Sequence, residues 1–168
     1  MKLEGIRVVD LSLFLPGPLL SQTMADHGAE VIKVEPPDGE PNREFGPREG
    51  EFSVYFRNTH RGKKSLCLNL KDPAAREALL KLCETADVFI EAFRPGVAAR
   101  LGVGYATVSA RNPRIVYCSI SAFGQYGPYR DHPAHDLATE ALAGVVSVNQ
   151  GANGEPVMPH MPVADITA

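Results

Sequence analysis

The chain has 168 residues, enough for one globular domain with its own core. Apolar residues make up 44% and charged residues 22% of it, proportions typical of soluble proteins, which argues against disorder. The net charge of −3 gives no overall basic field, which argues against nucleic acid as a partner. Charges interrupt the apolar residues near the N-terminus, and no stretch approaches the roughly 20 apolar residues of a membrane span. We therefore expect neither a signal peptide nor a membrane partner.

The three cysteines are far apart and form no CxxC pair. Cys67 and Cys118 lie in apolar, strand-like runs, where a buried thiol behaves as a small hydrophobic group. This use of cysteine is typical of a cytoplasmic protein with reduced thiols and without structural zinc.

The first forty residues predict a strand, a helix and a second strand. β-branched residues are concentrated at 6–11 and at 31–34, as in strands. Pro16-Gly17-Pro18 opens a helix between them, and Gly28 ends it, because glycine readily adopts the left-handed conformation of a helix C-terminus.

Residues 36–63 differ from the rest, being rich in Pro, Gly, Glu and Arg and lacking periodicity. Phe52, Tyr55 and Phe56 give this segment side chains to bury, which a flexible linker would lack. We therefore expect an ordered excursion loop.

Strands and helices then alternate along the chain. Apolar runs predict strands at 65–70, 87–91 and 115–120, and helices are expected from Asp72-Pro73 onward, after Pro95-Gly96, at 105–111 and at about 134–147. This alternation predicts an α/β domain with a doubly wound, mostly parallel sheet and helices on both faces. Such sheets bind ligands in the loops beyond the carboxyl ends of their strands, here 12–18, 35–39, 92–96 and 122–128. Residues 166–168 resemble the first turn of an unfinished helix, so we expect a fragment of a longer chain.

Basic residues gather in two places. Four cations lie within 57–64, just before a strand, and Arg94 and Arg100 flank the Pro95-Gly96 turn. Guanidinium and ammonium groups in such positions suit phosphates, although a solvated basic loop explains segment 57–64 equally well.

Two histidines and two aspartates near the C-terminus are candidates for chemistry. His132, His135 and Asp136 could ligate a metal, but Pro133 interrupts the helix across the pair and no third ligand recurs, so no metal site is expected. A first helical turn suits His135 and Asp136 better, because the helix dipole favours a carboxylate there. Asp165 precedes a helix start, where a simple N-cap and a reactive carboxylate are both possible. Residue patterns alone thus predict an α/β enzyme for a phosphorylated ligand.

Short motifs follow one another in a fixed order through the whole chain. They are Leu3-Glu4-Gly5-Ile6-Arg7-Val8-Val9-Asp10-Leu11, Pro16-Gly17-Pro18, Gly28-Ala29-Glu30-Val31-Ile32-Lys33-Val34-Glu35, Arg61-Gly62-Lys63-Lys64-Ser65, Phe93-Arg94-Pro95-Gly96, Asn112-Pro113-Arg114-Ile115-Val116-Tyr117 and Gly124-Gln125-Tyr126-Gly127-Pro128. In this order they resemble the class III CoA-transferases, a family that includes the alpha-methylacyl-CoA racemases. The resemblance implies that residues 1–168 are the N-terminal part of a large Rossmann-like domain. Family members are much longer and form interlocked homodimers.

The resemblance also implies substrates and site residues. Coenzyme A or an acyl-CoA enters as a substrate rather than as a permanently bound cofactor, and a carboxylic acid is the acceptor. CoA contacts are implied at Leu15, Leu68, Lys71, Phe93, Arg94 and Arg100. The chain departs from the family at two of its loops, with Leu15 where some transferases carry Gln and Pro36 where some carry Arg.

Two mechanisms share this scaffold. In the transferases, the aspartate that matches Asp165 attacks the acyl-CoA thioester, whereas in the racemases His135 and Asp165, with Asp136 beside them, would move the α-proton. The racemases are shorter within 36–63 and carry a glycine-rich run where this chain has 166–168, so the transferase reaction is favoured. A CoA-binding homologue without chemistry is the third alternative, and the intact Asp165 argues against it.

Overall fold

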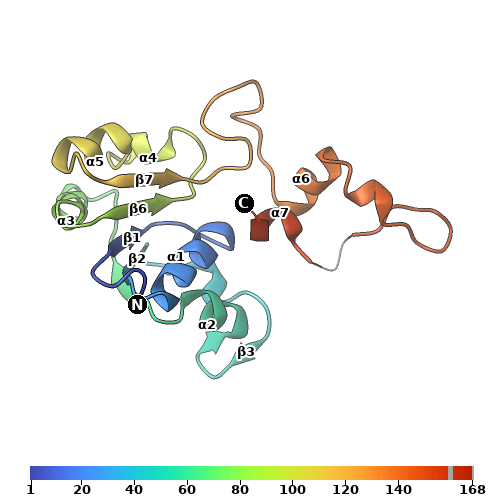
Figure 1. Ribbon diagram of the computed structural model, residues 1–168, viewed down its shortest axis with the longest axis horizontal. Helices are drawn as coiled ribbons and strands as arrows, with labels where there is room; N and C mark the ends of the chain where they lie inside the picture. The colour runs from blue at the N-terminus through green and yellow to red at the C-terminus, as the bar shows by residue number, and fades with distance from the viewer. Residues whose placement is uncertain (159–160, 168) are drawn as a thin grey trace.

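The computed structural model describes residues 1–158 and 161–167, and its centre is a parallel sheet (Figure 1). Five strands lie in the order β5-β2-β1-β6-β7, and each neighbouring pair is parallel. The strands are β1 (Arg7–Asp10), β2 (Glu30–Glu35), β5 (Lys64–Cys67), β6 (Val88–Glu91) and β7 (Val116–Ser119). The chain first runs outward from β1 to β2 and β5, and then returns to the other side of β1 for β6 and β7. The winding direction therefore reverses between β1 and β6, as in a doubly wound fold.

Helices cover both faces of this sheet, as predicted. Helix α1 (Pro16–Asp26) covers one face, where Val8 and Ile90 lie in a buried cluster. Helices α3 (Pro73–Cys83), α4 (Val97–Arg100) and α5 (Tyr105–Arg111) contribute to the core of the other face, which contains Val9 and Phe89. Neighbouring strand residues thus point into different cores, as the two-residue period of a strand requires.

Local signals explain where two of these helices begin and end. The carboxylate of Asp72 accepts a hydrogen bond from the backbone N–H of Ala74 at 2.8 Å and so caps α3. Gly28 follows α1 with φ of 101°, a conformation that favours glycine. Gly17 is also required, because a β-carbon at that position would lie 2.1 Å from the β-carbon of Ser12.

Residues 36–63 fold into a small layer of their own beside α1. They contain a 3₁₀ helix, η1 (Pro41–Arg43), the antiparallel strands β3 (Arg48–Glu49) and β4 (Phe52–Ser53), and helix α2 (Val54–His60), which packs on α1. This segment is therefore more regular than a loop.

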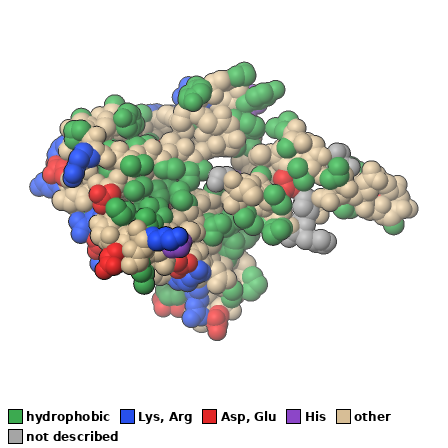
Figure 2. All heavy atoms as spheres, in the orientation of Figure 1, with side chains coloured by type: hydrophobic (Ala, Val, Ile, Leu, Met, Phe, Trp, Pro, Cys, Tyr) green, Lys and Arg blue, Asp and Glu red, His purple; other side chains and the backbone are tan. Residues whose placement is uncertain are grey.

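Residues beyond β7 extend away from the sheet (Figure 1). They form α6 (Asp136–Leu142), a second 3₁₀ helix, η2 (Val146–Val148), and α7 (Val163–Thr167), which returns to contact α1. The predicted helix at 134–147 is too long, because Gly144 adopts a φ of 80° just beyond α6. In Figure 2 this part of the surface is mostly hydrophobic or uncharged, and Leu142, Val148 and Met158 are all exposed. None of the helices in the described residues is long and apolar enough to span a bilayer.

Candidate active site

The carboxyl ends of all five strands meet at one edge of the sheet, and the loops that follow them line a series of cavities. Loop 11–15 follows β1 and loop 92–96 follows β6, so these two loops flank the point where the winding reverses. Ligands of doubly wound sheets bind at this point. The cavities therefore lie where the fold places a binding site.

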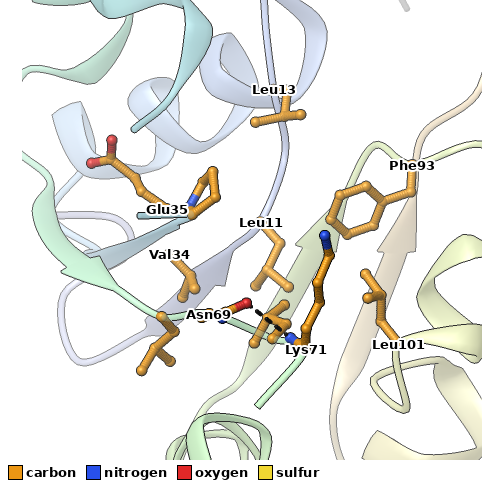
Figure 3. Close-up of a pocket in the computed structure, with 11 residues that line it drawn as sticks. Leu11, Leu13, Val34, Glu35, Asn69, Lys71, Phe93 and Leu101 are labelled. Atoms are coloured by element: carbon orange, nitrogen blue, oxygen red, sulfur yellow. Dashed lines mark hydrogen bonds between the residues drawn. The ribbon is translucent and has the colours of Figure 1, made fainter. Parts of the chain in front are cut away.

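The first cavity, here called the inner pocket, has a volume of about 180 Å³ and a mostly apolar lining (Figure 3). It is lined by Leu11, Leu13, Val34, Glu35, Pro36, Leu68, Asn69, Leu70, Lys71, Phe93 and Leu101. Figure 3 shows the Lys71 side chain extending toward the Phe93 ring at the mouth of the pocket. Three of the residues expected to contact CoA, Leu68, Lys71 and Phe93, thus share one pocket. A flat aromatic ligand with nearby negative charge suits this combination.

Arginine side chains gather around the turn after β6. A β-carbon at Gly96 would lie 3.5 Å from Nη1 of Arg100 and 3.7 Å from Nη2 of Arg130, so both guanidinium groups approach this turn. Arg94 and Arg130 line a neighbouring cavity of about 310 Å³, here called the outer cleft. Sequence reasoning selected Arg94 and Arg100 but missed Arg130, which comes from the segment after β7.

The basic residues selected from the sequence fall into two groups. Those of segment 57–64 are all paired, in the ion pairs Arg57–Glu49, Arg61–Asp26, Lys63–Asp10 and Lys64–Glu30. Lys71, Arg94 and Arg100 have no carboxylate partner among the described residues. A cation that already has a carboxylate partner is a poor candidate for phosphate, so the phosphate hypothesis fits the second group and not segment 57–64.

The second cavity, here called the acyl cleft, has a volume of about 210 Å³ and contains both predicted reactive side chains. Asp165 of α7 and His135, which precedes α6, line it. The other lining residues are Leu13, Phe14, Pro16, Ala92, Ile120, Ser121, Ala122, Ala134, Thr139 and Ala164. Leu13 also lines the inner pocket, and the outer cleft shares Phe93 with the inner pocket and His135 with the acyl cleft. The three cavities therefore adjoin one another along the carboxyl edge of the sheet, between Lys71 and Asp165.

Asp165 has an unusual electrostatic environment for an aspartate. Burial raises the pKa of its carboxyl group above the ordinary value of 3.8, Asp136 raises this pKa further, and His135 opposes both effects. The carboxylate accepts no hydrogen bond from the described residues. Tyr55 of α2 lies close enough that burial and the Asp165 charge together raise the pKa of its phenol to about 12. A partly buried carboxylate with no cation bound to it remains available as a nucleophile.

Two carboxylates on α6 hold the start of the helix that carries Asp165. Asp136 accepts a hydrogen bond from the backbone N–H of Asp165 at 3.0 Å, and Glu140, one turn later, accepts one from the N–H of Val163 at 3.0 Å. Both donors belong to the first turn of α7, and the N–H groups of a first turn have no acceptor within their own helix. The side chain of Asp136 therefore contacts the backbone of Asp165, whereas His135 and Asp165 share the cleft through their side chains.

A buried network of charges lies at the end of β1, directly before loop 11–15. Asp10 is fully buried and pairs with Lys33 at 3.6 Å and with Lys63 at 3.3 Å. It also accepts hydrogen bonds from the hydroxyl groups of Ser12 and Ser21. Burial alone would raise the pKa of Asp10, but these partners hold it below its ordinary value. The two lysines and two serines thus engage both oxygens of this carboxylate.

Leu15 and His132 lie outside the inner pocket and the acyl cleft. Leu15 is buried and is not among the residues that line the inner pocket or the acyl cleft. His132 packs against Tyr129 with ring centroids 5.3 Å apart, whereas His135 approaches Phe14. Within the described residues, no group of three or more His, Cys, Asp or Glu side chains could hold a metal ion.

Sequence reasoning missed Tyr55, Arg130 and Glu140 as site residues. The charge of Asp165 acts on Tyr55 because α2 and α7 both pack on α1, which brings together segments far apart in the chain. The aromatic residues within 36–63 indicated that this segment buries side chains, but they did not indicate which part of the fold it packs on.

The domain is thus doubly wound, with adjoining cavities that hold Lys71, Arg94 and Asp165 at the switch point where such sheets bind their ligands. The model of CoA-transferase family III matches residues 3–168, so the chain belongs to this family.

Curated relatives and a solved structure agree with this assignment. The chain is 42% identical to acetyl-CoA:oxalate CoA-transferase of Acetobacter aceti over 154 residues, covering 91% of this chain and 40% of the relative. It is 37% identical to human succinyl-CoA:glutarate CoA-transferase, covering 98% and 38%. The crystal structure of a CAIB/BAIF family protein from Brucella suis matches with a TM-score of 0.92 and 37% identity, covering 98% of this chain and 45% of that one. The chain thus spans about 40% of the length of the curated relatives it matches.

Proposed function

We propose that the full-length protein is an acyl-CoA:carboxylate CoA-transferase in which Asp165 is the nucleophile. The observation that carries this proposal is the series of three adjoining cavities, with Lys71 in the inner pocket, Arg94 in the outer cleft and Asp165 in the acyl cleft. Relatives named as CoA-transferases for oxalate and glutarate support the reaction type.

Coenzyme A fits this series of cavities by its chemistry. Its adenine ring would enter the inner pocket, where the apolar lining and the Phe93 ring provide contacts for a flat ligand. Its phosphates would meet Lys71, Arg94 and Arg100, whose charges have no carboxylate partner among the described residues. The pantetheine arm would follow the loops after β1 and β6 and place the thioester beside Asp165.

The reaction proceeds in covalent steps. The Asp165 carboxylate attacks the thioester carbonyl carbon, the carbon–sulfur bond breaks, and CoA leaves as a thiolate with a mixed anhydride on Asp165. The thiolate then attacks the side-chain carbonyl of Asp165, which releases the donor acid and leaves an aspartyl-CoA thioester. The acceptor carboxylate attacks this thioester and forms a second anhydride, and the thiolate finally takes the new acyl group and frees Asp165. A carboxylate suits each step because it is ionised at neutral pH and its acyl adducts remain reactive.

His135 and Asp136 have different places in this scheme. His135 lines the acyl cleft beside the thioester, where its ring contributes to the pocket wall without being essential. Asp136 acts through the backbone of Asp165, to which it is hydrogen-bonded. No resident cofactor is needed, because CoA itself is a substrate.

An alpha-methylacyl-CoA racemase is the second candidate. The observation that favours it is that His135 and Asp165 line the same cleft, as a pair that moves a proton between two faces of a substrate would require. His135→Ala would then lower the rate by orders of magnitude, whereas a transferase would keep much of its activity.

The partners and location follow from the same proposal. The exposed apolar residues of α6, α7 and the segment between them, such as Leu142, Val148 and Met158, suit burial in an interlocked homodimer of the full-length chain. The three free cysteines suit the reducing conditions of the cytoplasm, where we place the enzyme.

One incubation distinguishes the three functions. The full-length enzyme is mixed with a 2-methylacyl-CoA in heavy water, with and without a carboxylic acid acceptor. A transferase exchanges the acyl group only when the acid is present, and a racemase incorporates deuterium at the α-carbon without it. If the ester binds but neither acyl exchange nor deuterium incorporation occurs, the protein is a CoA-binding homologue and the proposal is contradicted.

A further inference from the structure

Phe14 has a backbone conformation that its side chain disfavours. Its φ is 62°, and no other non-glycine residue in the described ranges has a positive φ. A bulky residue in this left-handed region is a genuine outlier, because its side chain crowds the backbone there. Such strain persists only where the surrounding structure enforces it, and it is concentrated at functional sites.

Two buried side chains of the excursion enforce this conformation. The backbone N–H of Phe14 donates to Oε1 of Glu40 at 2.9 Å, and its carbonyl accepts a hydrogen bond from the side-chain amide of Asn42. Glu40 and Asn42 are each only 1% exposed, and Glu40 also accepts from the N–H of Asn42 at 2.6 Å. The hydroxyl of Ser53 in turn donates to the carbonyl of Asn42. Segment 36–63 therefore clamps both sides of one residue in loop 11–15.

The clamp directs the Phe14 ring to the acyl cleft. Phe14 lines the acyl cleft and the outer cleft, and its ring meets the His135 ring edge-on, with centroids 6.2 Å apart. It is the largest side chain in the described wall of the acyl cleft, where Ala92, Ala134 and Ala164 are small. The ring is still 46% exposed, so it borders open space and not the core.

We propose that Phe14 is a specificity-determining residue that limits the length of the acyl group beside Asp165, so that short acyl-CoA esters are preferred. This inference rests on the proposed function, because it assigns the acyl end of CoA to this cleft. Because the clamp fixes the Phe14 backbone, the ring can leave the cleft only by rotating about its own side-chain bonds, whereas on a free loop the backbone could move as well.

The test uses three substitutions in the full-length enzyme. Phe14→Gly removes the ring and suits the left-handed backbone, Phe14→Ala removes the ring but keeps the strain, and Phe14→Leu keeps the strain and most of the bulk. For each, kcat/KM is measured with acetyl-, butyryl-, hexanoyl- and octanoyl-CoA at a fixed acceptor concentration. Binding of the same esters is measured by calorimetry in the Asp165→Asn background, where turnover does not consume them.

The ratio of kcat/KM for octanoyl-CoA over acetyl-CoA should rise about tenfold or more in Phe14→Gly and Phe14→Ala, and far less in Phe14→Leu. The ratio of binding constants should follow the same order, and the Tm of Phe14→Gly should exceed that of Phe14→Ala. An unchanged ratio in both ring-deleted variants would overturn the inference, as would a change in Phe14→Gly alone, which would indicate loop mobility. Turnover by Asp165→Ala would instead refute the proposed function, while the binding ratios would still report on Phe14.

Discussion

Asp10 and Asp165 both adjoin the loops at the carboxyl edge of the sheet, but the protein surrounds them in opposite ways. Asp10 is fully buried with two lysines and two hydroxyl groups directed at it. Asp165 is partly buried, has the carboxylate of Asp136 nearby, and accepts no hydrogen bond from the described residues. Their pKa values move accordingly, down for Asp10 and up for Asp165.

The contrast distinguishes a structural carboxylate from a reactive one. A carboxylate whose lone pairs are all engaged is stabilised in its ground state and cannot attack a carbonyl carbon without losing those partners. Asp165 retains its lone pairs for a substrate. Substitution of Asp10 should therefore affect stability, and substitution of Asp165 should affect chemistry.

The largest effect is expected for Asp165. Asp165→Asn in the full-length enzyme should lower kcat by at least about three orders of magnitude, because the amide is no nucleophile. Its Tm should stay within a few degrees of the wild type, since the side chain has no partner to lose. Steady-state exchange assays and thermal unfolding check both points, and a large fall in Tm with kcat preserved would reverse the roles assigned to the two aspartates.

Substitution of Asp10 should act on stability. Asp10→Asn leaves Lys33 and Lys63 buried without a countercharge, and removing one partner from a buried ion pair costs about 3–5 kcal/mol. Urea unfolding of the full-length protein measures this. Asp26→Asn is the matched control, because the exposed Asp26–Arg61 pair should contribute only about 0–1 kcal/mol. Equal costs for the two variants would remove the distinction between them.

The third prediction concerns acid stability. Burial would raise the pKa of Glu35, but Arg43, Ser65 and the N–H of Glu40 lower it from 4.5 to about 2. The unfolded chain therefore binds this proton more tightly than the folded protein, so a contribution of about 3 kcal/mol is present above pH 4.5 and is lost as the pH falls toward 2.

Urea midpoints at pH 7 and at pH 3 measure this contribution. The gap between wild type and Glu35→Gln should be wide at pH 7 and should narrow at pH 3. Glu49→Gln, which removes the exposed pair with Arg57, should differ little from the wild type at either pH. A gap that stays constant with pH would exclude Glu35 as the source.

The smallest effect is expected where carboxylates act through the backbone. Asp136→Ala and Glu140→Leu each remove an acceptor for an N–H of α7, and a slightly misplaced Asp165 should lower kcat about 10- to 100-fold with a small change in KM. Glu140→Gln keeps an acceptor oxygen and should retain most of the activity. Loss of activity in Glu140→Gln equal to that in Glu140→Leu would indicate a need for charge and not for the hydrogen bond.

Sequence patterns predicted the sheet and most of its helices, because strands and caps are local signals. The strand at 87–91 and the helix at 105–111 both formed within a residue of their expected bounds. Helix α2 was missed, although Ser53 caps it by accepting from the N–H of Phe56. The expected helix at 134–147 missed the left-handed Gly144.

The site was harder to predict, because its properties depend on contacts between distant segments. The resemblance led to Leu68, Lys71 and Phe93, which do share a pocket. The ion pairs of segment 57–64 could not be predicted from the sequence, because partners such as Asp26 and Glu30 come from other elements. The strain at Phe14 could not be foreseen either, because nothing in a sequence marks a non-glycine residue for a positive φ.

The most direct test of the central claim is to trap the covalent intermediate. The full-length enzyme is incubated with an acyl-CoA without acceptor acid and quenched with hydroxylamine, and its peptides are analysed by mass spectrometry. Asp165 should carry a hydroxamate that is absent from Asp165→Asn and from the enzyme incubated without ester. Full acyl exchange with an unmodified Asp165, or with the hydroxamate on another carboxylate, would contradict the account.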